Sequence, residues 1–163
     1  MPKLKTLEKL DGHHREIEKI LKNMEDVVAN IQLGGEDAFQ MHFIELDKLR
    51  IRILTKSMLH FLQEEQVLFP EIVAALPKFK KIINGLLKEH DEIKEIYSEL
   101  VEAINRQNLT KLEKWATKAI KVLRSHIKHE DKMFAHVQGK WLTSEAAARI
   151  EKRLTEFQKA AVK

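Results

Sequence analysis

The chain has 163 residues and a net charge of +4, with 33% of its residues charged and 44% hydrophobic. A chain of this length suits one domain that buries about two-thirds of its unfolded surface. The absence of cysteine excludes disulfides, thiolate metal sites, iron–sulfur clusters and cysteine nucleophiles. The many lysines and glutamates, with few prolines and glycines, favour helices.

Charge and hydropathy also limit the partners. No apolar run approaches the ~20 residues that span a bilayer, and the N-terminal residues lack the apolar core of a secretory signal. The densest basic cluster, residues 78–81, is too short to follow a phosphate backbone. We therefore expect a cytoplasmic protein with no membrane partner and no nucleic-acid partner; the sequence identifies no protein partner.

Apolar residues recur with the period of an α-helix over two long stretches before residue 70. The first stretch covers about residues 6–33, and the Gly34-Gly35 pair is expected to stop the helix. The second follows directly and reaches Pro70, whose missing amide should kink the helix or end it. Pro77 closes the region, so the pattern predicts a helical hairpin over about residues 6–77.

The second half repeats this organisation with shorter connections. Helical patterns cover about residues 79–105 and 109–137, with a turn at 106–108 and Gly139 as the expected end. A shorter helix follows Thr143-Ser144, where either hydroxyl can cap free backbone amides. No stretch alternates with a period of two residues, so we predict an all-α fold. Long helices joined by short turns predict an up-down-up-down four-helix bundle with an additional short C-terminal helix.

The two hairpins resemble each other in sequence. An offset of 76 residues aligns Leu10, His14, Glu16, Ile17 and Ile20 with Leu86, His90, Glu92, Ile93 and Ile96. An offset of 66 residues aligns His60, Glu64 and Glu65 with His126, Glu130 and Asp131. We therefore expect residues 1–163 to form a single domain built from two duplicated hairpins, about 6–77 and 79–137, and a C-terminal helix over 143–161.

Histidines and glutamates occupy matching places in this repeat. His60 and His126 each precede a glutamate by four residues, a spacing that places both side chains on one helix face. His14 and His90 lie about as many residues from the turns of their hairpins as His60 and His126 do. Because each helical residue rises about 1.5 Å, all four histidines are expected at the same level of the bundle. Four imidazoles and two carboxylates are too many for one tetrahedral metal, so we predict two metals that share the carboxylates and keep open positions. The predicted ligands are His14, His60, Glu64, His90, His126 and Glu130.

This ligand set suits iron, manganese or zinc, and redox use favours iron. We expect no metal-binding role for His13, His42, His129 and His136, because helical geometry turns them away from the ligands or separates them along the axis. Glu18 is open to two interpretations, an additional ligand or a solvated helix charge. Tyr97 is also open to two, a donor to a bound small molecule or a packing residue.

Four segments carry a resemblance to a known family. They are Leu10 to Ile17, His60 to Pro70, Glu89 to Ile93 and His126 to Phe134. With these segments the chain resembles the hemerythrin-like, HHE cation-binding family. The resemblance implies a four-helix bundle with a non-haem di-iron centre bridged by two carboxylates, held by the six ligands named above. Oxygen-carrying hemerythrins place two histidines one turn apart on the third helix, whereas Leu86 and Lys94 occupy that spacing around His90.

Three functions are compatible with the sequence. The first is a binding or sensing protein whose two iron ions take up oxygen, nitric oxide or iron itself. The second is an enzyme, a peroxidase or ferroxidase, that uses the same centre with peroxide or iron as substrate. The third is a structural bundle that holds zinc or no metal. No separate catalytic residue and no organic cofactor are predicted.

Overall fold

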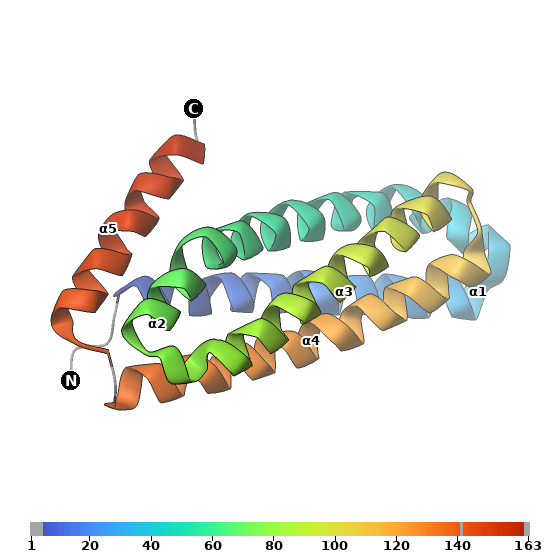
Figure 1. Ribbon diagram of the computed structural model, residues 1–163. Helices are drawn as coiled ribbons and strands as arrows, with labels where there is room; N and C mark the ends of the chain where they lie inside the picture. Colours follow the sequence, from blue (N-terminus) through green and yellow to red (C-terminus); the bar gives the residue numbers. More distant parts are fainter. Residues whose placement is uncertain (1–4, 141, 162–163) are drawn as a thin grey trace.

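The computed structural model describes residues 5–140 and 142–161, and it is a bundle of helices (Figure 1). The described residues contain no strand, which confirms the expected all-α fold. A π-helical turn (η1) and a 3-10 turn (η2) interrupt the α-helices. In chain order the elements are α1 (Lys5–Gln63), η1 (Glu64–Leu68), α2 (Phe69–Ala75), η2 (Pro77–Phe79), α3 (Lys80–Asn105), α4 (Leu109–Lys140) and α5 (Ser144–Ala161).

Helix α1 folds back on itself. If its 59 residues were straight, His14 and His60 would lie about 69 Å apart along the axis, but their Nε2 atoms are 2.9 Å apart. Figure 1 places the bend at the end of the bundle far from both termini, with the two arms running side by side. The predicted hairpin is therefore present, formed by a first arm (residues 5–31) and a second arm (residues 46–63).

The expected helix stop at Gly34-Gly35 is wrong, because the backbone stays helical through both residues. Glycine weakens a helix by about 1 kcal/mol without preventing helical hydrogen bonds. What reverses the chain is the burial of both arms in one apolar cluster, in which Val27 and Ile31 of the first arm join Leu46 and Leu49 of the second.

Pro70 shapes the backbone at the end of the second arm. Its ring would clash with the carbonyl four residues earlier in a regular α-helix. The chain forms the π-helical turn η1 instead, in which the Phe69 N–H donates to the Glu64 carbonyl, and α2 begins with the proline in its first turn. Leu76 then leaves the helical region with φ −137°, and Pro77 starts η2. The predicted kink therefore takes the form of a widened turn.

Helices α3 and α4 form the second hairpin. Gln107 adopts a positive φ of 50° at the tight turn, and the Asn108 side chain accepts a hydrogen bond from the Lys111 amide at 3.0 Å. Helix α4 ends at Lys140, one residue beyond the expected Gly139. Of the two hydroxyls considered for the cap of α5, that of Thr143 accepts a hydrogen bond from the Ala146 amide at 3.2 Å.

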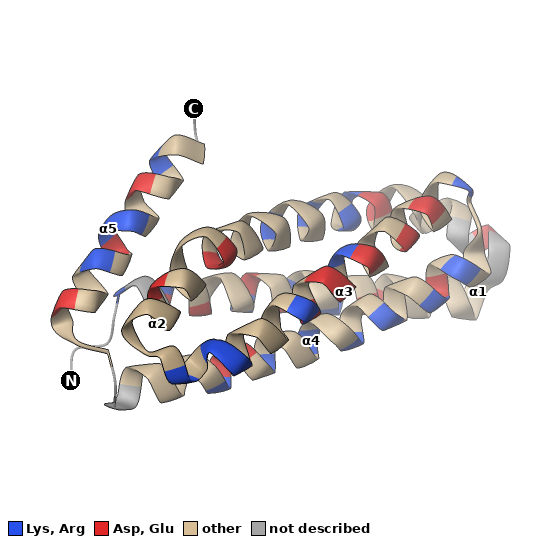
Figure 2. Cartoon of the chain, in the orientation of Figure 1, with Lys and Arg blue, Asp and Glu red and all other residues tan. Residues whose placement is uncertain are grey.

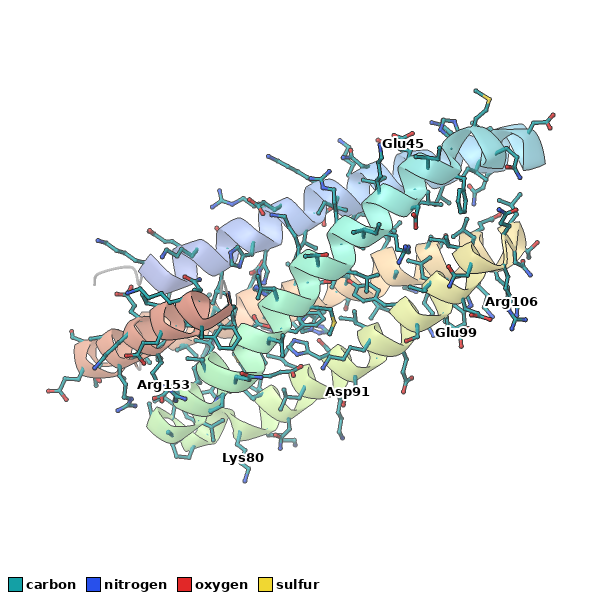
Figure 3. All side chains as sticks on the ribbon, turned by 90° about the horizontal axis from the view of Figure 1, so that it is seen from above. Glu45, Lys80, Asp91, Glu99, Arg106 and Arg153 are labelled. Carbon is teal, nitrogen blue, oxygen red and sulfur yellow. The ribbon has the colours of Figure 1, made fainter. Side chains whose placement is uncertain are left out.

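The apolar core is divided into two clusters along the bundle. The larger cluster fills the end near the bend, with Leu100 fully buried among residues of α1, α3 and α4. The smaller cluster fills the end near the termini, where Leu10 and Phe69 meet Ile150 and Leu154 of α5. Charged residues of both signs are spread along α1, α3, α4 and α5 (Figure 2). Figure 3 shows Glu99 pointing away from the bundle.

Helix α5 lies across the end of the bundle and contacts α1, η1 and α2. Besides its apolar residues, two arginines hold it in place. Arg149 Nε donates to Glu71 Oε2 at 2.6 Å, and Arg153 donates to the other oxygen of the same carboxylate. None of the described helices combines the length and the apolar character needed to cross a membrane.

The division of the core predicts where stability resides. Leu100→Ala should lower the free energy of unfolding by about 2–5 kcal/mol, because it opens a cavity at a fully buried position. Leu33→Ala is the matched control, since Leu33 is 88% exposed and its loss should change stability by less than about 0.5 kcal/mol. Chemical denaturation of both variants measures the difference; equal midpoints would contradict this description of the core.

Candidate metal centre

Six ionisable side chains meet in one layer between the two apolar clusters. They come from four helical segments: the first arm of α1, the second arm of α1 continued by η1, helix α3 and helix α4. All are buried, with at most 3% of any of them exposed. They are the six residues singled out from the sequence, His14, His60, Glu64, His90, His126 and Glu130.

The six residues form two groups of four that share both carboxylates. One group contains His14 and His60 and the other His90 and His126, and within each group one ligand atom from each residue lies within 4.8 Å of the others. Each carboxylate presents one oxygen to each group. The contacts are His60 Nε2–Glu64 Oε1 3.0 Å, His90 Nε2–Glu64 Oε2 3.3 Å, His14 Nε2–Glu130 Oε2 3.0 Å and His126 Nε2–Glu130 Oε1 2.8 Å.

A second ring of side chains fixes the orientation of the imidazoles. Three of the four histidines donate from Nδ1 to a carboxylate, which leaves Nε2 to face the centre. The pairs are His14 Nδ1–Asp131 2.7 Å, His90 Nδ1–Glu65 2.8 Å and His126 Nδ1–Glu89 2.7 Å. The fourth histidine, His60, has its Nδ1 3.4 Å from Nδ1 of His13.

The sequence analysis assigned no role to these outer partners, although a signal was available. Asp131 and Glu65 directly follow the shared glutamates and occupy equivalent positions under the 66-residue offset. Glu89 directly precedes His90, and the 76-residue offset places His13 at the equivalent position of the first hairpin. The outer contacts therefore follow the same repeat as the inner residues, with an imidazole replacing a carboxylate at one of four positions.

The chemistry of the layer fits a bound cation. Neither oxygen of the Glu64 carboxylate has a hydrogen-bond partner, although both are fully buried. An unsatisfied buried polar group costs roughly 1–3 kcal/mol, and a charged one costs more. The imidazole Nε2 atoms also meet in close pairs, 2.9 Å apart for His14 and His60 and 3.1 Å apart for His90 and His126. Lone pairs on imidazoles and carboxylates turned toward one point are the donors that divalent transition metals select.

A comparison with known families agrees with this geometry. The profile of the hemerythrin HHE cation-binding domain matches residues 5–137. The chain belongs to the hemerythrin family. The matched range contains both hairpins and all six residues of the buried layer, and it ends before α5. Neither curated protein sequences nor solved structures gave a match.

The protein groups of this hemerythrin domain strongly perturb one another. Burial lowers the pKa of His14, but hydrogen bonds to Asp131 and Glu130 outweigh it and raise the pKa to about 9. For His60, burial is outweighed by the charge of Glu64 and by a hydrogen bond to Glu130, which raise the pKa to about 10. The pKa of His90 rises to about 9 in the same way, against its burial.

Glu130 experiences the opposite effect. Burial raises the pKa of this carboxyl, but hydrogen bonds from His126, His14, His60 and His90 more than compensate and hold it well below its usual range. The layer therefore favours an ionised Glu130 with positive charge beside it.

Aromatic rings close the layer of the hemerythrin centre on both sides. Phe61 stacks on His90 with ring centroids 3.9 Å apart and meets His126 edge-on at 5.5 Å. From the smaller cluster, Phe69 stacks on His90 at 5.8 Å and Phe134 on His14 at 6.4 Å. These contacts restrict the rotation of the imidazoles and keep water away from their faces.

The remaining candidates lie outside both groups. Glu18 is half exposed and accepts an ion pair from Arg124 at 2.8 Å, which agrees with a solvated helix charge. Tyr97 is buried, and its hydroxyl lies 2.9 Å from the Ser57 hydroxyl, so it packs and bonds within the larger cluster. Among the described residues, the other four histidines do not belong to either group: His13, His42, His129 and His136.

The raised pKa values predict that metal binding depends on pH. His14, His60 and His90 hold protons near neutral pH because their pKa values lie at about 9 to 10, and a metal must displace these protons. Affinity should therefore rise from about pH 6 toward about pH 9, with proton release on binding. Calorimetry of ferrous or zinc ion binding in buffers of different ionisation enthalpy measures the release. Affinity that is constant over this range would contradict the assignment.

The outer ring predicts a second effect. Asp131→Asn keeps the shape of the side chain but removes the charge that His14 Nδ1 meets at 2.7 Å, so metal affinity should fall about 10–100-fold. Asp91→Asn is the matched control, because Asp91 is an exposed aspartate on α3. Competition with a metal-binding dye measures both affinities. The same affinity in the two variants would show that the outer carboxylate does not support the ligand.

Proposed function

We propose that this hemerythrin domain holds two non-haem iron ions and uses them to bind oxygen, nitric oxide or a similar small ligand. The observation that carries the proposal is the arrangement of the two carboxylates, each with one oxygen toward either histidine pair. A carboxylate between two groups of donors suits two cations that share it. A single ion would make use of only one group.

The number of donor atoms would also leave each ion with a coordination position for a small ligand. Each ion would receive two Nε2 atoms and one oxygen from each of Glu64 and Glu130, four protein atoms in all. Non-haem iron that is bound by histidine and carboxylate keeps further positions for exogenous ligands. When bound, the iron pair would supply those positions and the electrons for reversible redox change.

The protein's own groups would prepare this chemistry. The outer acceptors Asp131, Glu65 and Glu89 hold Nδ1 protons on three imidazoles, so that their Nε2 lone pairs face inward. The rings of Phe61, Phe69 and Phe134 separate the layer from water. Both effects favour stable binding of a small uncharged ligand over exchange with solvent.

Iron content tests the proposal directly. Protein reconstituted with ferrous iron should retain about two irons per chain, as expected for two groups of mixed imidazole and carboxylate donors. Glu64→Ala should lose both ions, because Glu64 belongs to both groups, whereas His14→Ala should weaken one ion more than the other. The exposed Glu99→Ala is the control. One iron per chain, or an unchanged content in Glu64→Ala, would overturn the dinuclear proposal.

Two further measurements separate the remaining functions. An optical spectrum that changes on exposure to oxygen or nitric oxide, without turnover, supports the binding or sensing role. Sustained consumption of peroxide, or oxidation of many ferrous ions per chain, would assign the alternative role of a peroxidase or ferroxidase. Retention of zinc in preference to iron would assign a structural or zinc-binding bundle.

A further inference from the structure

A groove on the second hairpin is not covered by any helix of the described residues. It lies between the start of α3 and the end of α4 and has a volume of about 380 Å³. We call it the α3–α4 groove. Among the described residues, only this hairpin and the turn before it line the groove: Phe79, Ile82, Gly85, Leu86, Glu89, His129, Lys132, Met133 and His136. Its walls are mostly apolar, and Ile82 is 49% exposed there.

The equivalent place on the first hairpin is covered. The sequence offsets align Leu86, Glu89 and His129 with Leu10, His13 and Gln63. These three residues line a smaller cavity of about 120 Å³, and α5 forms the opposite wall with Glu151, Leu154, Thr155 and Gln158. The equivalent surface is therefore covered by the amphipathic helix α5 on the first hairpin and left open on the second. Figure 1 shows α5 over α1 and α2, away from α3 and α4.

The α3–α4 groove does not suit a second copy of α5. Helix α5 is anchored by Arg149 and Arg153 on the carboxylate of Glu71. The 66-residue offset aligns Glu71 with Val137, which is apolar and buried. The two arginines would find no carboxylate at the equivalent place.

The rim of the groove is cationic instead. Lys132 of α4 lines it, and Lys78 lies with its Nζ 5.6 Å from the ring centre of Phe79. Lysines also mark the start of α3 in Figure 2, and Figure 3 shows Lys80 pointing away from the bundle. The acidic member, Glu89, already accepts hydrogen bonds on both oxygens, at 2.7 Å from His126 and 2.6 Å from His129. A partner with acidic flanks therefore complements the rim.

The lack of a side chain at Gly85 leaves space in the α3–α4 groove. Glycine inside a helix costs about 1 kcal/mol relative to alanine, yet a Cβ at Gly85 would have no described atom within 4 Å other than those of its chain neighbours and the adjacent backbone of its own helix. The side chain that is missing would project toward the groove rather than into the core, since Gly85 is exposed and lines the cavity. A larger residue here would occupy the space without disturbing the bundle.

We propose that the α3–α4 groove binds an amphipathic helix of a partner protein, with apolar residues at helical spacing and acidic residues on both flanks. Such a helix places apolar side chains at positions i, i+3 or i+4 and i+7 into a groove of this kind. Its apolar face would cover the exposed Ile82, and its acidic flanks would meet Lys132. Because Glu89 lines the groove and accepts the Nδ1 proton of His126, the docked helix contacts the side chain that orients one of the buried histidines.

A designed peptide tests the docking. The probe is a fluorescently labelled peptide with the sequence of residues 143–161, in which Arg149→Glu and Arg153→Glu convert the α5 anchors into acidic flanks. Fluorescence anisotropy with the full-length protein should show saturable binding at one site per chain. Gly85→Leu should weaken it about tenfold by filling the groove, and Lys132→Glu should weaken it by a similar factor through charge repulsion.

Matched variants outside the groove test whether the loss of binding is specific to the groove residues. Gly12→Leu changes another helical glycine with equally open surroundings, and Lys128→Glu reverses a lysine one turn from Lys132; neither residue lines the groove. Both should bind the peptide as the unmodified protein does. Ile82→Glu, at a half-exposed position, checks the groove without relying on Gly85. Circular dichroism confirms folding of each variant.

Several outcomes would overturn the proposal. They are the absence of peptide binding, or binding that survives both Gly85→Leu and Ile82→Glu. Equal binding of the unmodified α5 peptide would assign the groove to a second copy of this chain. Saturable binding of 2-naphthoate that Gly85→Leu abolishes, with no peptide binding, would assign it to a small aromatic anion. None of these results depends on the iron content, so the proposed iron centre stands or falls separately.

Discussion

The burial of six ionisable side chains in one layer of an apolar bundle is the constraint on which the rest of this structure depends. Such a layer separates the two hydrophobic clusters and would be unstable without compensation. The compensation is arranged in two shells. Carboxylates between the histidines meet the inner nitrogens, and outer acceptors such as Asp131 hold the Nδ1 protons. The two buried oxygens of Glu64 have no hydrogen-bond partner, and a cation held between the two groups of donors would complete the arrangement.

The helical framework explains why so few residues can build this layer. A histidine and a glutamate four residues apart point to one side of a helix, so the His60–Glu64 and His126–Glu130 pairs each deliver two donors from one segment. Antiparallel hairpins then bring the other histidines to the same height. The π-helical turn that begins at Glu64 accommodates Pro70, and Phe69 stacks on the ring of His90. Local strain at the proline is thus resolved beside the centre, where widened turns are often found.

The sequence predicts the helical elements and the six inner residues from spacing within single helices, and the structure brings those six residues into one buried layer. The outer partners depend on how neighbouring helices are rotated against each other. Adjacent residues point about 100° apart around a helix, so Glu65 reaches across to His90 while Glu64 faces inward. No periodicity within one helix reveals which neighbour such a side chain meets. The continuous helix through Gly34-Gly35 was missed for a related reason, because tertiary packing outweighs the local preference of glycine.

The six inner residues follow the repeat symmetrically, but their outer partners do not, so the two groups of donors are inequivalent. Both histidines of the second group, His90 and His126, donate to carboxylates. In the first group His14 also meets a carboxylate, but His60 meets the imidazole of His13. A carboxylate on Nδ1 increases the basicity of the coordinating nitrogen and fixes its orientation. The second group should therefore hold its ion more firmly, and the first, next to the cavity that α5 closes, should exchange its ion more readily. Two ions that share the same bridges would then differ in affinity because of a single residue in the outer shell.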